Sequence, residues 1–186
     1  MRADAERSTA RILEAAEKVL ADDASASLEK IADAAGLARA TVHRRFASRK
    51  ALVDALSERF NDRYRHGIDQ ARVGTAPPMV ALHRLTESAF EVKTSYRLVV
   101  DLSHGPDDDV LAGIDLLFAR LHESGVITAA QPTWCRNVYL ALLHEVHLLP
   151  ADAAELADGG DEVESRSALL IRSVLGALGG KPQPRS

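Results

Sequence analysis

The residues whose types and spacing could do chemistry gather in one basic segment between Ala34 and Val53. This segment holds no acidic residue and five basic ones: Arg39, Arg44, Arg45, Arg49 and Lys50. Arginine can bind phosphate oxygens or guanine edges through two parallel hydrogen bonds, so the segment is a candidate contact for nucleic acid. A solvated helix face has the same composition, and for a charge run alone it is the commoner case. The position of these bases in the fold must decide between the two interpretations.

The net charge of the whole chain is negative and does not reveal this basic segment. The formal net charge is -4, but residues 1–60 carry eleven Lys/Arg and ten Asp/Glu, whereas residues 61–186 carry twelve and seventeen. The two parts therefore have net charges of +1 and -5, which sum to -4. A basic segment on an otherwise acidic protein can be a local electrostatic footprint for phosphate.

Two other patterns are weaker candidates for chemistry. His144 and His147 could share a helix face and a metal ion, but the spacing is not that of a metalloprotease and the sequence indicates no third ligand. Cys135 is the single cysteine, which excludes an internal disulfide. No phosphate-binding glycine loop, nucleophile elbow or paired-carboxylate motif is present. We therefore expect no catalytic residue, no metal site and no cofactor.

Length and composition describe a globular chain of one or two domains. It has 186 residues, of which 46% are hydrophobic and 27% charged, so it is too apolar for disorder and too charged for a membrane protein. No apolar run approaches the roughly 18 residues of a membrane-spanning helix. The first residues lack the apolar stretch of a signal peptide. These features predict a soluble, cytoplasmic protein with no membrane partner.

Apolar residues recur at three- and four-residue spacing along the chain, which predicts an all-α fold of about nine helices. The first helix is expected to begin at Ser8 as its N-cap. In the helix over 132–149 the expected inward stripe is Trp134, Val138, Leu142 and Leu149. The expected helices cover residues 8–22, 27–35, 39–46, 48–64, 78–92, 95–103, 107–124, 132–149 and 161–178. The expected domains are 1–47 and 48–186.

Residues 28–46 have the pattern of two short helices joined by a tight turn at Gly36. Glycine permits the turn conformation that a residue with a β-carbon resists. If Val42 and Phe46 face inward at 100° per residue, Ala40 and Arg44 point directly away from the core. The bases thus lie on the exposed face of the second helix, which favours a DNA contact over a merely solvated face.

The segment Ser8 to Leu56 resembles the N-terminal domain of the TetR family of transcriptional regulators. The matching stretches are Arg11 to Ala16, Ser27 to Leu37, Thr41 to Phe46 and Ser48 to Leu52. The resemblance implies a sequence-specific DNA-binding regulator, a repressor released from a palindromic operator by a small molecule. The DNA-binding residues it implies are Ser27, Arg39, Ala40, Thr41, His43, Arg44, Arg45, Arg49 and Lys50. Ala38 departs from the family pattern, in which a serine commonly caps the recognition helix.

The resemblance also implies a C-terminal domain that binds a ligand and forms a homodimer through its last two helices. The candidate interface residues are Val163, Leu170, Ile171, Val174, Leu175 and Leu178. Burial of this stripe within the same chain is the alternative. The candidate ligand-binding residues are His83, Phe90, Tyr96, Phe118, Trp134, Tyr139 and His144, although core packing explains each of them taken singly.

A function of another class stays open at this point. A helical small-molecule-binding or metal-dependent enzyme could retain the same N-terminal fold. The arginines on one helix face favour the regulator, because an enzyme has no need of a basic segment free of acids.

Overall fold

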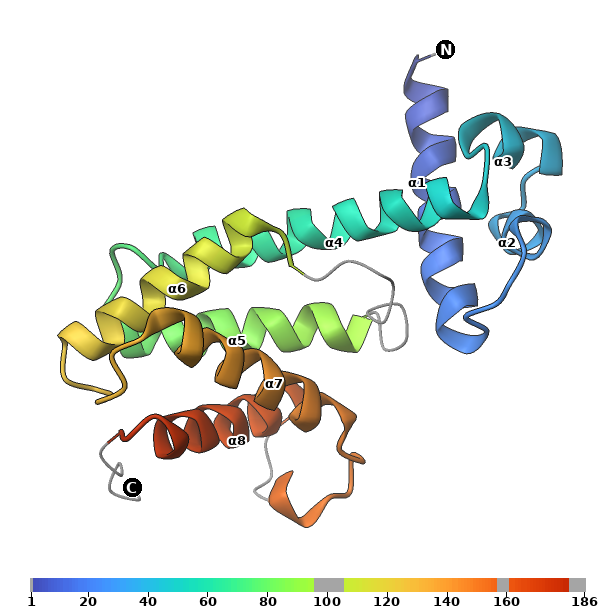
Figure 1. Cartoon of the computed structure of the whole chain (residues 1–186). Coiled ribbons are helices and arrows are strands. Elements are labelled where there is room, and N and C mark those ends of the chain that lie inside the picture. The colour runs from blue at the N-terminus through green and yellow to red at the C-terminus, as the bar shows by residue number, and fades with distance from the viewer. Residues whose placement is uncertain (1, 96–105, 157–160, 181–186) are drawn as a thin grey trace. The chain divides into compact units, whose positions relative to one another are not determined.

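A computed structural model of the chain describes residues 2–95, 106–156 and 161–180, and these residues form helices joined by turns (Figure 1). The elements are α1 (Arg2–Asp22), α2 (Leu28–Ala35), α3 (Arg39–Arg45), α4 (Arg49–Ala71), α5 (Pro78–Ser95), α6 (Asp108–Glu123), α7 (Pro132–Leu148), the 3-10 turn η2 (Ala154–Leu156) and α8 (Glu162–Ala177). The all-α prediction is confirmed. The helix expected over 95–103 falls almost wholly outside the described residues.

The chain forms two compact units that divide within α4. The N-terminal unit comprises Met1–Asp62 and Ser95–Gly105, and the C-terminal unit comprises Arg63–Thr94 and Pro106–Ser186. The division thus lies beyond the expected boundary at residue 47. The first turns of α4 belong to the N-terminal unit, where Leu52 and Leu56 are fully buried.

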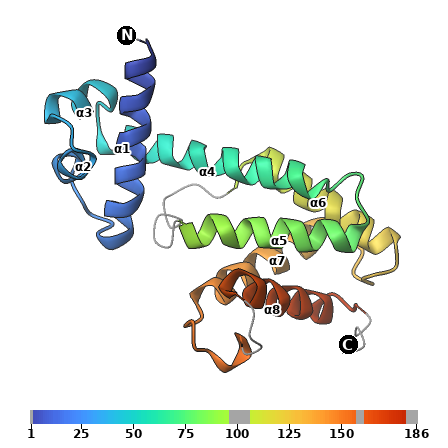
Figure 2. The same cartoon turned by 180° about the vertical axis from the view of Figure 1, so that it is seen from behind.

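The N-terminal unit consists of α1, α2, α3 and the start of α4, with α2 packed against both α1 and α3 (Figure 2). Its core contains Ile12, Ile31 and Val42, all with no exposed surface. The expected start of the first helix at Ser8 was wrong, because α1 begins at Arg2 and the Ser8 hydroxyl donates to the Asp4 carbonyl at 2.7 Å inside the helix. A serine that bonds the carbonyl four residues earlier does not interrupt a helix.

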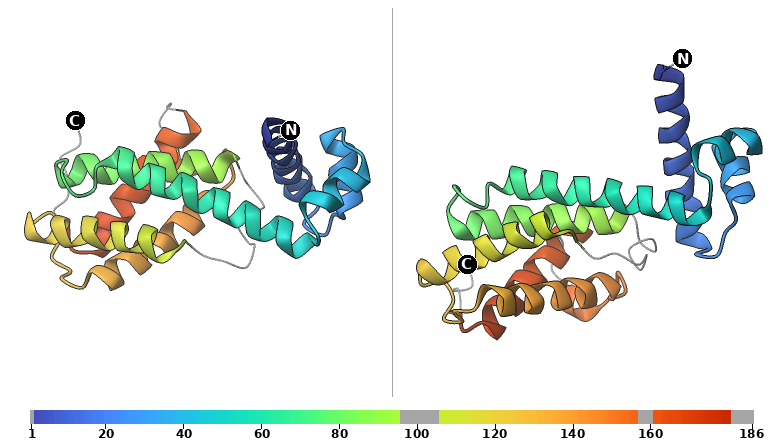
Figure 3. Two further views of the ribbon diagram at one scale, coloured as in Figure 1. Left: turned by 90° about the horizontal axis from the view of Figure 1, so that it is seen from above. Right: turned by 45° about the horizontal axis from the view of Figure 1, so that its top comes forward.

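The C-terminal unit consists of the second part of α4 with α5 to α8, as Figure 3 shows from two directions. Helix α6 packs on α7, and α7 packs on α8. Small residues allow close helix contacts: a Cβ atom at Gly67 of α4 would lie 2.6 Å from Ser88 Oγ of α5. Helix α4 is longer than expected and ends at Ala71 rather than near Tyr64.

The inward face of α7 differs from the expected stripe. Cys135, Tyr139, Leu143 and Val146 are buried, whereas the Trp134 side chain is 61% exposed. The apolar residues of α7 occupy more than one face, so periodicity alone could not show which face meets the rest of the chain. The structure therefore shifts the buried stripe by about one residue.

Candidate nucleic-acid interface

Helix α2 has a defined cap at each end. The Ser27 hydroxyl accepts a hydrogen bond from the Lys30 amide at 3.3 Å, as the sequence predicted for an N-cap. Gly36 ends the helix in the left-handed conformation, with φ 62° and ψ 38°. The Leu37 amide then bonds back to the Ala32 carbonyl at 3.0 Å, the arrangement of a Schellman cap. These bonds fix the turn that leads into α3.

Arg11 of α1 holds this turn from the side, a role that the sequence did not reveal. Its Nη2 donates to the Ala35 carbonyl at 2.7 Å and lies 3.5 Å from the Gly36 carbonyl. A guanidinium at a helix C-terminus satisfies carbonyls that have no partner within the helix and interacts favourably with the helix dipole. The direction of α3 from α2 therefore depends on a residue of α1.

Replacement of Gly36 by alanine is expected to destabilise the N-terminal unit by about 1–2 kcal/mol, since a Cβ atom is strained in the left-handed region. That atom would also lie 3.3 Å from Arg11 Nη2. Gly125→Ala is the matched control, because Gly125 has φ +71° but open space around its Cβ position. Urea unfolding of both variants measures the difference. An equal loss of unfolding free energy in the two variants would show that the close approach to Arg11 adds nothing to the cost of Gly36→Ala.

Helix α3 presents its basic residues to solvent. Val42 is fully buried and Phe46 is 6% exposed, so this pair forms the inward face as expected. On the other faces Arg39, Ala40, His43, Arg44 and Arg45 are exposed and Thr41 is half-buried. Ala38 provides no side-chain cap, so the first amides of α3 are left without a side-chain partner.

The basic residues of α3 differ in the contacts that they make with acidic residues of the protein. Within the described part of the chain, Arg44 and Arg45 form no ion pair. Arg39 Nη2 lies 4.0 Å from Asp33 Oδ2, a distance at which an exposed pair contributes little. His43 Nε2 lies 3.4 Å from Glu29 Oε1. Arg44 is thus an exposed arginine pointing away from the core with no competing partner in the protein.

The carboxylate that faces His43 is stabilised in its charged form. Hydrogen bonds from its own backbone amide, from the Ser27 hydroxyl and from His43 lower the pKa of Glu29. The charged carboxylate lies within hydrogen-bond distance of the His43 ring nitrogen. The pair therefore ties α3 to the first turn of α2 at the edge of the basic surface.

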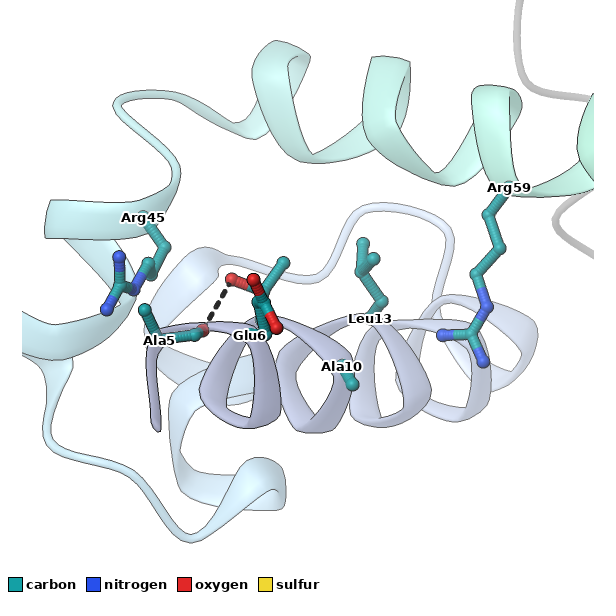
Figure 4. A pocket seen from close by; sticks show the side chains of 7 residues that line it. Ala5, Glu6, Ala10, Leu13, Arg45 and Arg59 are labelled. Atoms are coloured by element: carbon teal, nitrogen blue, oxygen red, sulfur yellow. Dashed lines mark hydrogen bonds between the residues drawn. The ribbon is translucent and has the colours of Figure 1, made fainter. Parts of the chain in front are cut away.

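Arg45 and Arg59 flank a shallow hollow of about 500 Å³ beside α1. Figure 4 shows Arg45 at the Ala5 end of this hollow and Arg59 at the other end. The Thr9 hydroxyl donates to the Ala5 carbonyl at 3.0 Å within α1. Arg45 therefore extends toward the first turns of α1 and not in the outward direction of Ala40 and Arg44.

The two bases at the start of α4 are bound within the N-terminal unit. The Arg49 guanidinium donates to the carbonyls of Ala24 and Ala26, so it holds the loop between α1 and α2. Lys50 Nζ lies 2.8 Å from Asp54 Oδ2, one helical turn further on. The Ser48 hydroxyl caps α4 by accepting from the Ala51 amide at 3.1 Å.

The residues expected to bind a ligand separate into two groups. Phe90, Phe118 and Tyr139 lie together in the core of the C-terminal unit, where the last two rings are 5.7 Å apart between centroids. By contrast, His83, Trp134 and His144 are exposed. Tyr96 lies outside the described residues.

The residues expected in the dimer interface lie in the core of this same chain. Leu170 and Val174 have no exposed surface, and Ile171, Leu175 and Leu178 are at most 8% exposed. Val163 is half-buried. The apolar surface of this stripe is therefore largely covered before a second chain approaches.

Two properties of the described residues bear on other functions. No group of three or more His, Cys, Asp or Glu side chains in this part of the chain could hold a metal ion. None of the helices described is long and apolar enough to cross a membrane.

Comparisons with known proteins agree with this geometry. The model of the bacterial regulatory proteins of the tetR family matches residues 12–56. The HTH-type transcriptional repressor LfrR of Mycolicibacterium smegmatis is 33% identical over 149 residues, which are 74% of this chain and 76% of that repressor.

Solved structures show the same fold over most of the chain. The crystal structure of LfrR in complex with proflavine matches with a TM-score of 0.63 and 28% identity, covering 92% of this chain and 96% of LfrR. AibR in complex with isovaleryl coenzyme A and operator DNA matches with a TM-score of 0.69 at 15% identity, covering 92% and 97% of the two chains. The capped helix pair, its exposed basic face and the identity to LfrR lead to one conclusion: this chain belongs to the TetR family of bacterial regulatory proteins.

Proposed function

We propose that this protein is a transcriptional repressor that binds a palindromic operator as a homodimer and leaves it when a small molecule binds the C-terminal unit. The observation that carries the proposal is the exposed face of α3, where Arg44 has no ion-pair partner among the described residues. The proposal places the protein in the cytoplasm with the DNA and assigns it no catalytic activity.

The proposed DNA contacts follow from the side chains of α3 and its neighbours. Arg44 and Arg39, with Ala40 and Thr41 between them, would face the base edges of the major groove. His43 and Arg45 lie on the sides of α3, where they would face the phosphates of the DNA backbone. Arg49 and Lys50 have partners inside the unit, so we assign them to shaping the surface and to its positive potential.

The proposed dimer face is the outer side of α7. Trp134 and Leu148 are each 61% exposed there, and Val138 lies between them half-buried. Exposed large apolar side chains on one helix face indicate a surface that another protein covers. A two-fold dimer would present two copies of α3 to two half-sites about 34–36 Å apart.

Release by a ligand requires that the ligand bind the DNA-free arrangement more tightly than the DNA-bound one. LfrR has been crystallised with proflavine, so a relative of this chain accepts a small aromatic molecule. Helix α4 contributes residues to both compact units. We propose that α4 transmits ligand binding from one unit to the other.

The proposal is tested by selecting bound fragments from the source genome and titrating the best fragment by fluorescence anisotropy. We expect a palindromic site and an affinity that falls roughly 1,000-fold between 50 and 200 mM salt, the loss typical of about six phosphate contacts. Recovery of fragments with no shared site, bound with the same affinity as random DNA, would contradict the proposal.

A further inference from the structure

The exposed face of α7 has a large apolar residue near each end and a small residue at its centre. Trp134 and Leu148 are each 61% exposed, one in the first turn of the helix and one in the last. Ala141 is also exposed and lies midway between them in the sequence. Because an α-helix rises about 1.5 Å per residue, each large side chain lies about 10 Å along the helix from Ala141. The sizes of the side chains are therefore symmetric about Ala141.

Helical periodicity places these three residues on one line along α7. At about 100° per residue, Trp134 and Leu148 lie about 20° to either side of Ala141 around the helix axis. The buried residues of α7 lie on the opposite side of the helix: Cys135, Tyr139, Leu143 and Val146. The line of exposed residues thus points away from the core of its own chain, where a second protein can reach it.

Two exposed polar residues are also placed symmetrically about Ala141. Asn137 lies one helical turn before Ala141, and Glu145 lies one turn after it. A side-chain amide can donate a hydrogen bond to a carboxylate, so an Asn137 fits the Glu145 of another copy of this chain. The face is therefore complementary to itself when it is turned end over end.

We propose that two copies of the chain pack through α7 as antiparallel helices that cross at Ala141. A two-fold interface is isologous, so each contact between different residues occurs twice. Trp134 of each copy packs on Leu148 of the other, and Asn137 donates to Glu145 of the other. This inference rests on the proposed function, since it specifies how the proposed dimer face is paired.

The side chains of the face select the geometry of this pairing. The distance between two packed helices depends on the side chains at the contact, and the small Ala141 permits a close approach at the crossing. Contact of Trp134 with Leu148, each about 10 Å from the crossing, requires a shallow angle of about 20°, which is common in helix bundles.

Charge disfavours a parallel pairing of the same two faces. A parallel arrangement would place the Glu145 carboxylates of the two copies opposite each other, and like charges between neighbouring helix positions repel. In the antiparallel arrangement the two Glu145 residues lie on opposite sides of the crossing, about 12 Å apart along the helices. Each carboxylate then has an amide of the other copy as its neighbour.

A short thiol cross-linker tests the pairing, because it joins positions that are in contact. The native Cys135 is 1% exposed, so the wild-type protein should form no cross-linked dimer. Ala141→Cys should cross-link to itself, since the two-fold axis brings this position next to its own copy. Trp134→Cys alone and Leu148→Cys alone should not, because like positions lie about 21 Å apart. A mixture of these two variants should cross-link after subunit exchange.

Two cross-linking patterns would overturn the proposal. Self-cross-linking of both Trp134→Cys and Leu148→Cys would indicate that the helices pair in parallel. Absence of a cross-link both in Ala141→Cys and in the mixture would show that the two copies do not meet at this face. All three substituted residues are exposed, so the variants are expected to fold.

Charge variants of Asn137 test the polar contact separately. Asn137→Lys should lower the dissociation constant of the dimer about fivefold, because two new lysines face the two Glu145 carboxylates. Asn137→Glu should raise the dissociation constant by about the same factor. Gln70→Lys and Gln70→Glu are the matched controls, because they change an exposed amide of α4 in the same way and should have no effect. Equal dissociation of the two Asn137 variants, measured by sedimentation, would show that Asn137 does not face Glu145.

Operator binding separates this inference from the proposed function. A protein that gives the expected cross-links but binds no operator would keep the pairing at Ala141 and lose the repressor function. A protein that binds the operator without these cross-links would keep the repressor function and overturn the pairing.

Discussion

The Arg44→Ala variant is expected to lose sequence-specific operator binding while keeping its fold. Arg44 is exposed, points away from Val42 and Phe46, and has no ion-pair partner among the described residues. A bidentate contact from arginine to guanine contributes about 1–3 kcal/mol of discrimination, and a dimer makes it twice. Operator affinity should therefore fall by roughly 100-fold or more, which anisotropy titration measures.

The comparison with random DNA distinguishes base recognition from simple charge. Loss of one phosphate contact per chain would weaken all sequences alike and reduce the salt dependence by about one unit for each contact. We instead expect affinity for random DNA to change less than about tenfold. Arg84→Ala removes an exposed arginine of α5 and should leave both affinities unchanged. Unaltered operator binding by Arg44→Ala would show that Arg44 does not contact bases in the major groove.

The helix pair of the N-terminal unit could be predicted because its signals are local. Ser27 before an apolar helix pattern and Gly36 directly after it mark both ends of α2, and the structure confirms both. The exposed face of α3 followed from Val42 and Phe46, which lie four residues apart. Periodicity and caps act within one element, so the sequence displays them directly.

The contacts between distant segments could not be predicted in the same way. Arg11 lies 24 residues from the Ala35 carbonyl that it binds, and nothing in its spacing indicates that acceptor. The bonds of the Arg49 guanidinium to the Ala24 and Ala26 carbonyls could not be predicted either, because those carbonyls become its neighbours only after folding. Trp134 belongs to a helix with apolar residues on several sides, so its exposure depends on which face the neighbouring helices cover.

The burial of Lys93 and Arg166 could have been predicted from their positions in the sequence. Each lies within the apolar row of its helix, Lys93 after Thr86 and Ala89, and Arg166 four residues before Leu170. A cation in such a row is predicted to be buried and therefore to need a partner. The sequence does not show which groups those partners are. For Arg166 the structure shows the carbonyls of Val146, His147 and Leu149 and the Glu162 carboxylate.

Replacement of Arg166 by methionine is expected to cost about 3 kcal/mol of unfolding free energy, because three carbonyls at the end of α7 lose the guanidinium that donates to them. Arg166 Nη2 donates to the Leu149 carbonyl at 2.9 Å, and Nη1 donates to those of Val146 and His147. These acceptors lie in the last turn of α7 and just after it. Urea unfolding at one fixed protein concentration measures the change, since dimerisation makes stability depend on concentration.

Two further variants show which bond of Arg166 matters. Glu162→Gln removes the charge of the ion-pair partner, whose side chain is 44% exposed, and should cost less than about 1 kcal/mol. Arg166→Lys keeps the positive charge but cannot reach three carbonyls in a planar fork, so it should fall between the other two. Equal losses in Glu162→Gln and Arg166→Met would mean that the ion pair, and not the capping of α7, provides the stability.

The same series tests whether the end of α7 must be fixed for the proposed dimer. Leu148 is 61% exposed and lies in the turn whose carbonyls Arg166 binds. If that turn frays, Leu148 no longer has a fixed position on the proposed dimer face. Dimer dissociation measured by sedimentation should therefore increase in the order Glu162→Gln, Arg166→Lys, Arg166→Met, in parallel with the loss of stability. Because a dimer binds two half-sites and a monomer one, operator affinity should weaken in that order although no DNA-facing residue has changed.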